Sequence, residues 1–273
     1  MPDSRPIGVF DSGVGGLTVA RALMDLLPDE RILYFGDTAR GPYGPRPLAQ
    51  VRAFTREIVD HLAARDTKLV VAACNTATAA AVESSDPLEF SVPVVGVIAP
   101  AVSAAVRATR NGRIGVIGTV GTISSGAYDR AVERVAPDVK LVAQACPRFV
   151  ELVETGRTTD PGVLEVAAEY LAPLRAADVD TLILGCTHYP LLTGVLSYVM
   201  GPDVVLVSSA EETARRVFAT LVDNDLLAHA PEAEHRFIAS GDPDAFAALA
   251  GRFLGPRLVD VEVQPLRAAS PQA

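Results

Sequence analysis

Long apolar segments, paired cysteines and an excess of basic charge are all missing from this sequence of 273 residues. No apolar run approaches the ~20 residues that span a bilayer. No apolar stretch precedes Ile7, so we expect no signal peptide and a cytoplasmic protein without membrane contacts. The net charge of −9 argues against nucleic-acid binding, which depends on neutralising phosphates. The three cysteines show no CxxC spacing, so we expect free thiols rather than a disulfide or a zinc site.

Nucleotide and metal motifs are missing as well. The segment Gly13-Val-Gly-Gly16 lacks the last glycine of a dinucleotide fingerprint, because Thr18 occupies that position. The similar segment Gly115–Gly121 also departs from the fingerprint, and no G-K-[ST] sequence is present. Taken alone, residues 13–16 fit a structural turn and an anion-binding turn equally well. The histidines show no metal-ligand spacing, so we expect neither a metal nor another cofactor.

Short apolar runs rich in β-branched residues alternate with amphipathic helical patterns. Such runs are typical of parallel strands buried on both faces, and the alternation indicates an α/β fold with right-handed crossovers. One helix is predicted after Pro47, and another is predicted to begin at Asp160-Pro161. The predicted strands are Ile7–Asp11, Ile32–Asp37, Leu69–Cys74, Pro93–Ile98, Arg113–Thr119, Leu141–Cys146, Thr181–Cys186 and Val204–Ser209.

The two halves of the chain resemble each other. Residues 7–16 resemble residues 114–123, which lie 107 positions later, and residues 69–76 resemble residues 181–188, with the cysteines 112 positions apart. Chance similarity between apolar strands is the alternative. After residue 209 we predict a helix near Ala210, a segment 235–241, a helix at Asp242-Pro243 and an extended segment 258–263. This tail is too small for a domain, so we place it on the first half.

Polar side chains follow several predicted strands at the point where each strand ends. Because ligands of open α/β sheets bind outside the carboxyl ends of the strands, we expect one site there. Helix N-termini in such a site offer free backbone N–H groups that suit a carboxylate. The segments concerned are Asp11-Ser12-Gly13, Cys74-Asn75-Thr76, Thr119 with Thr122, Cys186-Thr187-His188 and the loop Pro42-Tyr43-Gly44.

Cys74 and Cys186 occupy matching strand–turn–helix positions. A single buried cysteine is most often inert packing, which is what we expect of Cys146. At a helix N-terminus the pKa of a thiol is lowered, and His188 would add a positive partner for Cys186. Asp11 would orient Cys74 or take its proton. Two acid/base groups on opposite faces of a carbon atom can invert it without turning the substrate over.

Two other chemistries compete with this interpretation. A cysteine protease needs one cysteine, one histidine and an orienting group, which leaves the second cysteine unexplained. A pyridoxal-phosphate racemase needs a Schiff-base lysine. The two lysines of the chain, Lys68 and Lys140, each lie just before a predicted strand. Proton transfer between two thiols is therefore favoured.

These motifs closely resemble the glutamate racemase family over essentially the whole chain. The matching segments are Ile7–Thr18, Asp37 through Gly44, Ala73–Ala77, Gly185–Pro190, Ser240–Pro243 and Phe253–Gly255. The resemblance implies interconversion of L- and D-glutamate without a cofactor, which supplies D-glutamate for peptidoglycan. It also implies two similar α/β domains with mainly parallel sheets, related by a pseudo-two-fold axis, with the active site in the cleft between them. One domain would comprise residues 1–98 plus 210–273 and the other residues 99–209.

The resemblance also implies roles for single residues. Cys74 would act on D-glutamate and Cys186 on L-glutamate, with Asp11 and His188 assisting the respective thiols. Glu154 matches a family acid near the site, and a solvated carboxylate at a helix end is the alternative. The residues expected to bind substrate are Asp11, Ser12, Tyr43, Gly44, Asn75, Thr76, Thr119, Thr122, Thr187 and His188.

Partners and substrate leave alternatives open. A homodimer is implied by the resemblance, and some family members bind DNA gyrase as a second role, which nothing in this sequence tests. Other members of the superfamily act on aspartate, hydantoins or arylmalonates. The decarboxylases among them keep one catalytic cysteine, whereas this chain has two. A preference for aspartate as substrate depends on the length of the cleft, so this alternative stays open. A binding or regulatory protein that has kept the fold is the non-enzymatic alternative.

Overall fold

The computed structural model describes residues 3–228, 233–255 and 261–266. These residues form two sheets, one of six strands in the order β10-β9-β2-β1-β3-β4 and one of four in the order β6-β5-β7-β8. Every strand pairing among them is parallel, which confirms the predicted α/β class. The strands are β1 (Ile7–Asp11), β2 (Ile32–Gly36), β3 (Leu69–Ala72), β4 (Val94–Gly96), β5 (Arg113–Gly118), β6 (Lys140–Ala145), β7 (Thr181–Gly185), β8 (Val205–Ser208), β9 (Arg236–Ala239) and β10 (Val261–Val263).

The two sheets repeat one strand order. In the first sheet β1 lies between β2 and β3, with β4 outside β3, and in the second sheet β5 lies between β6 and β7, with β8 outside β7. Ile7 pairs with Ile32 and Leu69, and Ile114 pairs with Leu141 and Thr181 in the same way. The internal repeat is therefore a repeat of topology, and chance similarity does not account for it.

All eight strands predicted between residues 7 and 209 form. Several end one or two residues early, so that Cys74 and Cys186 lie just beyond β3 and β7. The prediction that every strand is buried on both faces was wrong for two of them. β6 is half-buried, and β8 is partly exposed. Both are edge strands of their sheet, and an edge strand has a neighbour on one side only.

The tail joins the first sheet, as expected. β9 pairs with β2, and β10 pairs with β9. Of the predicted extended segment 258–263, residues 258–260 lie outside the described part of the chain. The helix predicted at Asp242 begins there, because the carboxylate of Asp242 accepts hydrogen bonds from the amides of Asp244 and Ala245.

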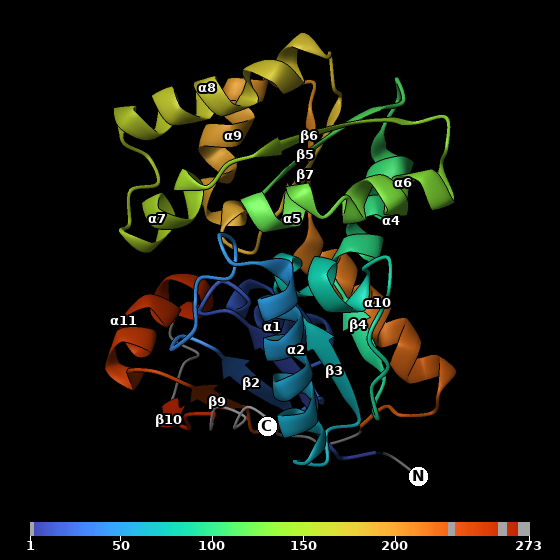
Figure 1. Ribbon diagram of the computed structural model, residues 1–273, viewed down its shortest axis with the longest axis vertical. Helices are drawn as coiled ribbons and strands as arrows, with labels where there is room; N and C mark the ends of the chain where they lie inside the picture. The colour runs from blue at the N-terminus through green and yellow to red at the C-terminus, as the bar shows by residue number, and fades with distance from the viewer. Residues whose placement is uncertain (1–2, 229–232, 256–260, 267–273) are drawn as a thin grey trace.

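Helices pack against both sheets and bury their apolar faces (Figure 1). The helix after Pro47 begins at Leu48, and the side chain of Asp160 caps the helix that follows it by accepting from the Val163 amide. The helical segments are α1 (Leu17–Leu26), α2 (Leu48–Ala63), α3 (Asn75–Ala77), η1 (Thr78–Val82), α4 (Ile98–Ala108), α5 (Val120–Ser124), α6 (Ala127–Val135), α7 (Arg148–Glu154), α8 (Pro161–Ala176), η2 (Tyr189–Leu192), α9 (Thr193–Met200), α10 (Ser209–Asp223) and α11 (Pro243–Leu254).

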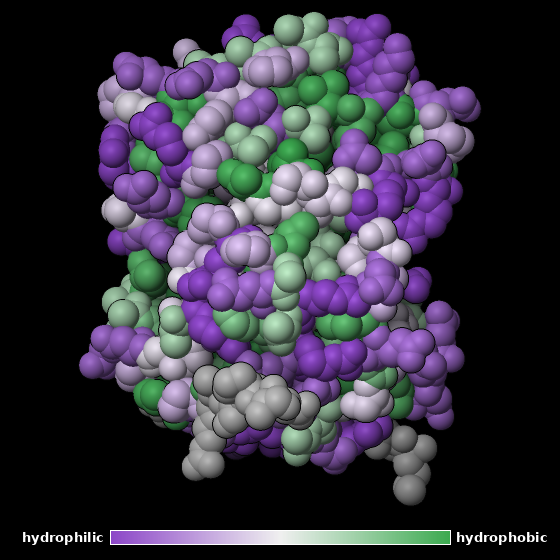
Figure 2. All heavy atoms as spheres, viewed as in Figure 1, coloured by the Kyte–Doolittle hydropathy of each residue, from purple (hydrophilic) through white to green (hydrophobic). Residues whose placement is uncertain are grey.

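The surface of the molecule carries both hydrophilic and apolar side chains. Figure 2 shows hydrophilic and apolar residues interspersed over one face of the molecule. Within the described residues, no helix combines the length and the apolar character needed to cross a bilayer.

Candidate active site

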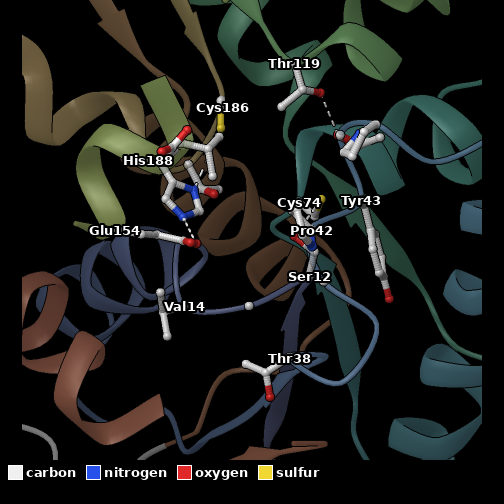
Figure 3. A pocket seen from close by; sticks show the side chains of 18 of the residues that line it. Ser12, Val14, Thr38, Pro42, Tyr43, Cys74, Thr119, Glu154, Cys186 and His188 are labelled. Atoms are coloured by element: carbon white, nitrogen blue, oxygen red, sulfur yellow. Dashed lines mark hydrogen bonds and ion pairs between the residues drawn. The ribbon is translucent and has the colours of Figure 1, made fainter. Parts of the chain in front are cut away.

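A cavity of about 560 Å³ lies where the carboxyl ends of the two sets of strands face each other (Figure 3). Most of the residues predicted to form the site line this cavity, and they come from both sheets. From the first sheet these are Ser12, Tyr43, Gly44, Cys74, Asn75 and Thr76, and from the second Thr119, Glu154, Cys186, Thr187 and His188. The cavity therefore lies outside the carboxyl ends of the strands, where the sequence analysis expected a site.

Cys74 follows β3 and occupies the N-cap position of the short helix α3, without a capping hydrogen bond from its side chain. Its Sγ atom lies 3.9 Å from the hydroxyl of Ser12. Burial, reinforced by the negative charge of Asp11, raises the pKa of Cys74 to about 12, although the backbone N–H of Ala77 acts in the opposite direction. The expected lowering by a helix N-terminus was wrong for this thiol. The regular helix has only three residues and continues as a π-helical turn, so its effect is smaller than the cost of burying a charge.

Cys186 follows β7 and contacts a histidine. Its Sγ atom lies 3.9 Å from Nδ1 of His188, whose Nε2 lies 3.0 Å from the carboxylate of Glu154. Burial alone would lower the pKa of His188, but hydrogen bonds to Cys186 and Glu154 outweigh it and raise this pKa to about 10. Glu154, at the end of α7, is therefore more than a solvated carboxylate at a helix end, because it pairs with an imidazole in the cavity.

Asp11 lies at the end of β1 and reaches across to the second half. One of its oxygens accepts from the amide of Gly13 at 3.0 Å, and the other faces the hydroxyl of Thr187 at 3.5 Å. Burial raises the pKa of Asp11, and the charge of His188 opposes this shift. Asp11 does not line the cavity, and among the described contacts it has no hydrogen bond to Cys74, which it influences through its charge.

The glycine-rich turn after β1 allows a close approach between the halves. A Cβ atom on Gly15 would lie 2.4 Å from Oγ1 of Thr187 and 2.5 Å from the ring of His188. The turn therefore serves packing, one of the two interpretations left open by the sequence, and it brings α1 against residues 187–188.

Several residues expected to bind substrate also form hydrogen bonds across the two halves. The hydroxyl groups of Thr76, Thr119 and Thr122 lie 2.9–3.1 Å apart. The side-chain amide of Asn75 donates to the hydroxyl of Tyr128 at 3.0 Å, and its Oδ1 atom has no partner among the described residues. Thr122 lies behind the cavity wall rather than in it.

Tyr43 lines the cavity, but its hydroxyl group binds another side chain of the protein. The phenol donates a short hydrogen bond to the buried carboxylate of Asp37. In Figure 3 the ring of Tyr43 points away from Thr119 and Cys186. The Tyr43 hydroxyl is therefore engaged with Asp37, and substrate binding by Tyr43 and Gly44, which both line the cavity, stays a prediction.

Part of the cavity wall was missed by sequence reasoning. Helix α11 contributes Ala245, Phe246 and Leu249, and its N-cap residue Asp242 lines the cavity as well. The tail was assigned to the first half without a role at the site, and an amphipathic pattern alone does not say which cavity a helix faces. The segment Ser240–Pro243, which carried part of the resemblance, was the available signal.

The third cysteine and the two lysines lie elsewhere. Cys146 is fully buried and, like Lys68 and Lys140, is not among the described residues that line the cavity. The ammonium group of Lys68 forms a buried ion pair with Glu30 at 2.6 Å. Within the described part of the chain, no group of three His, Cys, Asp or Glu side chains could coordinate a metal ion.

Comparison with known proteins agrees with this geometry. The family model for Asp/Glu/Hydantoin racemase matches residues 17–217. A glutamate racemase from Beutenbergia cavernae is 60% identical over 268 residues, covering 94% of this chain and 91% of that protein. The crystal structure of glutamate racemase isoform RacE1 from Bacillus anthracis has a TM-score of 0.90 at 42% identity, covering 97% of this chain and 98% of that one. The glutamate racemase from Francisella tularensis, solved in complex with D-glutamate, has a TM-score of 0.91 at 34% identity, covering 98% and 100%.

The chain is therefore an isomerase, an amino-acid racemase of the Asp/Glu/hydantoin racemase family. Within that family it belongs to the glutamate racemases. The resemblance drawn from the motifs is confirmed.

Proposed function

We propose that this protein interconverts L- and D-glutamate without a cofactor, with Cys74 and Cys186 as its two acid/base groups. One observation carries this proposal. Two thiols that follow corresponding strands of the two sheets line a single cavity. Inversion at Cα needs a proton acceptor on one face and a donor on the other, and a site with one thiol from each half supplies both.

The surroundings of the thiols suggest which one removes the proton from L-glutamate. Cys186 contacts the imidazole of His188, whose raised pKa keeps a positive charge beside the sulfur. Cys74 is buried and carries its proton. Cys186 takes the α-proton of L-glutamate while the Cys74 thiol gives its own proton to the opposite face. The reverse reaction begins with Cys74 as thiolate and Cys186 as thiol.

The negative charge that develops on the substrate carboxylate requires donors around it. We assign this task to Ser12, Thr76 and Thr187 and to the main chain of Tyr43 and Gly44, five residues that line the cavity. Asn75 also lines the cavity, and we assign it to binding the polar groups of the substrate. Asp11 is assigned to Cys74, Glu154 to His188, and Thr119 and Thr122 support Thr76.

The remaining expectations are part of the same proposal. Glutamate as substrate is supported by relatives at 54–60% identity that are glutamate racemases. We propose domains of residues 1–98 plus 210–273 and of residues 99–209, a cytoplasmic homodimer, and a role in supplying D-glutamate for peptidoglycan. Gyrase binding stays a prediction from the resemblance alone.

The test uses the whole protein with L-glutamate in D2O and no added cofactor. Optical rotation and deuterium at Cα are followed together. We expect rotation to decay to zero while deuterium enters Cα. Absence of both in the wild-type protein would overturn the proposal, and the same assay with L-aspartate tests the choice of substrate.

A further inference from the structure

Asp37 is a fully buried carboxylate just beyond the end of β2. Within the described part of the chain, three side chains donate to it. Tyr43 and the Nε atom of Arg40, at 2.7 Å, donate to Oδ2, and the hydroxyl of Ser240 donates to Oδ1 at 2.8 Å. A buried carboxylate is stable only with such partners. Its three donors come from the loop that follows it and from the distant tail.

The tail contributes through the first two residues of the Ser240–Pro243 segment. The oxygen of Ser240 also accepts from the amide of Ala39 at 3.0 Å, and the amide of Gly241 donates to the hydroxyl of Thr38 at 3.0 Å. The end of β9 therefore fixes the start of the loop at residues 37–39. This explains why a tail segment far away in sequence accompanies the strand-end motifs.

The far end of this loop reaches the second half of the molecule. The amide of Gly121 in α5 donates to the carbonyl of Gly44 at 2.9 Å. A Cβ atom on Gly44 would lie 2.8 Å from the Cβ of Thr119, so only glycine permits this approach. Between its two ends the loop contributes residues 41–45 to the cavity wall. A loop fixed at both ends presents its main chain at a constant position.

The middle of the loop is braced by Arg40. Besides Asp37, its guanidinium contacts the carboxylate of Glu57 at 2.5 Å and lies 4.2 Å from the ring centre of Phe54. Both of these residues belong to α2, so the helix behind the loop takes part in the same network. The network ties β2, the loop, α2 and the tail to one carboxylate.

We propose that Asp37 and Ser240 are positioning residues for racemisation, which hold loop 38–45 so that its main chain meets the substrate. The inference rests on the proposed function. Tyr43 acts within it through the hydrogen bond of its phenol to Asp37 and makes no side-chain contact with the substrate. Loss of the network moves residues 41–45, and a displacement of about 1 Å in a binding group is enough to cost roughly 100-fold in rate.

A second buried carboxylate provides a matched control. Asp180, at the start of β7, accepts from the hydroxyl of Thr109 at 2.6 Å and from the amides of Arg110 and Asn111 at 2.7 and 2.8 Å. It lies at the edge of the second sheet opposite the cavity and is not among the described residues that line it. Asp180→Asn therefore perturbs a buried carboxylate network without touching the loop.

The kinetic test compares Asp37→Asn, Ser240→Ala, Ser240→Thr and Asp180→Asn. We expect KM for glutamate to rise about tenfold or more in Asp37→Asn and Ser240→Ala. Ser240→Thr keeps the hydroxyl and should recover most of the loss, and Asp180→Asn should keep the wild-type KM even where its Tm falls. Equal changes in KM for Asp37→Asn and Asp180→Asn, or no recovery in Ser240→Thr, would overturn the proposal.

Limited trypsin digestion measures the loop without reference to activity. The Arg40–Gly41 bond lies in the loop, whereas Arg46 precedes Pro47 and resists cleavage. Asp37→Asn and Ser240→Ala should be cut at Arg40 several-fold faster than the wild type, and Asp180→Asn should not. Unchanged cleavage would overturn the positioning role. If the wild-type protein fails to racemise glutamate, the proposed function fails, yet this measurement still decides whether Asp37 and Ser240 hold the loop. If Asp37→Asn does not fold, Ser240→Ala and Tyr43→Phe serve in both measurements.

Discussion

The imidazole of His188 lies between two side chains, with the Glu154 carboxylate 3.0 Å from Nε2 and the Cys186 sulfur 3.9 Å from Nδ1. These two contacts raise the pKa of His188 to about 10, so the ring is positively charged at neutral pH. His188 is buried, whereas the side chain of Glu154 is 41% exposed, so this pair connects the thiol to the solvent-facing end of the cavity. Glu154 therefore reaches Cys186 only through the imidazole that lies between them.

Replacing Glu154 by Gln should make racemisation more sensitive to alkaline pH. Removing the carboxylate takes away one of the interactions that raise the pKa of His188, so the imidazole loses its proton at lower pH. We expect the alkaline limb of kcat/KM to move down by about 1 unit. A pH profile between 7 and 10.5 measures the shift.

Glu151→Gln is the matched control for this change. Glu151 lies on the same helix and lines the same cavity, but its carboxylate has no ion pair among the described contacts. The alkaline limb of kcat/KM in Glu151→Gln should stay at the wild-type pH. An equal shift in both variants would show that net charge in the cavity, and not the contact with His188, sets the limb.

His188 should also make folding stability depend on pH. Its pKa rises from 6.5 in the unfolded chain to about 10 in the folded protein, so the stabilisation is fully present below pH 6.5 and is lost as the pH approaches 10. His188→Gln removes this dependence. Urea unfolding at pH 6, 8 and 10 should show a steeper loss in the wild type than in the variant, and parallel losses would argue against a charged His188.

The three cysteines allow a direct comparison of roles. Cys74→Ser and Cys186→Ser should each lower kcat by about 100-fold or more, because a serine hydroxyl is a far weaker acid than a thiol. Cys146→Ser is the control, since Cys146 lies outside the cavity lining and its Sγ is already 3.7 Å from the carbonyl of Gln144. Near-normal turnover in either of the first two variants would exclude that thiol as a base.

Gly15 should tolerate no side chain. Gly15→Ala would place a methyl group 2.4 Å from Thr187 and 2.5 Å from the ring of His188, so the two halves must separate or the ring must move. We expect kcat/KM to fall about tenfold or more. Gly194→Ala in α9, whose Cβ would meet nothing within 4 Å, should keep full activity. Equal activity of the two variants would contradict the close packing at residue 15.

Much of this site could be predicted from the sequence because parallel strands bring their carboxyl ends to one edge. Asp11 ends a recognisable apolar strand, and Cys74, Thr119 and Cys186 each follow one, so their proximity follows from topology. Which atoms face the cavity does not follow from topology. The phenol of Tyr43 binds Asp37 because a buried carboxylate requires donors, and this pairing depends on loop geometry that no periodicity encodes.

The pKa of Cys74 shows the same limit. Its position before a helix was visible in the sequence, and the Ala77 amide does act in the expected direction. Burial and the charge of Asp11 act against it and prevail. The balance between these effects depends on three-dimensional burial, which a local motif does not report.

The central claim, proton transfer between two thiols on opposite faces of Cα, is tested most directly by the label in each enantiomer at early times. L-Glutamate is incubated with the wild-type protein in D2O and both enantiomers are recovered after a few per cent of reaction. The account predicts that the D-glutamate carries solvent deuterium at Cα while the remaining L-glutamate still carries protium, because one thiol removes the proton and the other delivers its own. Protium retained in the D-glutamate, or equal deuterium in both enantiomers, would contradict it.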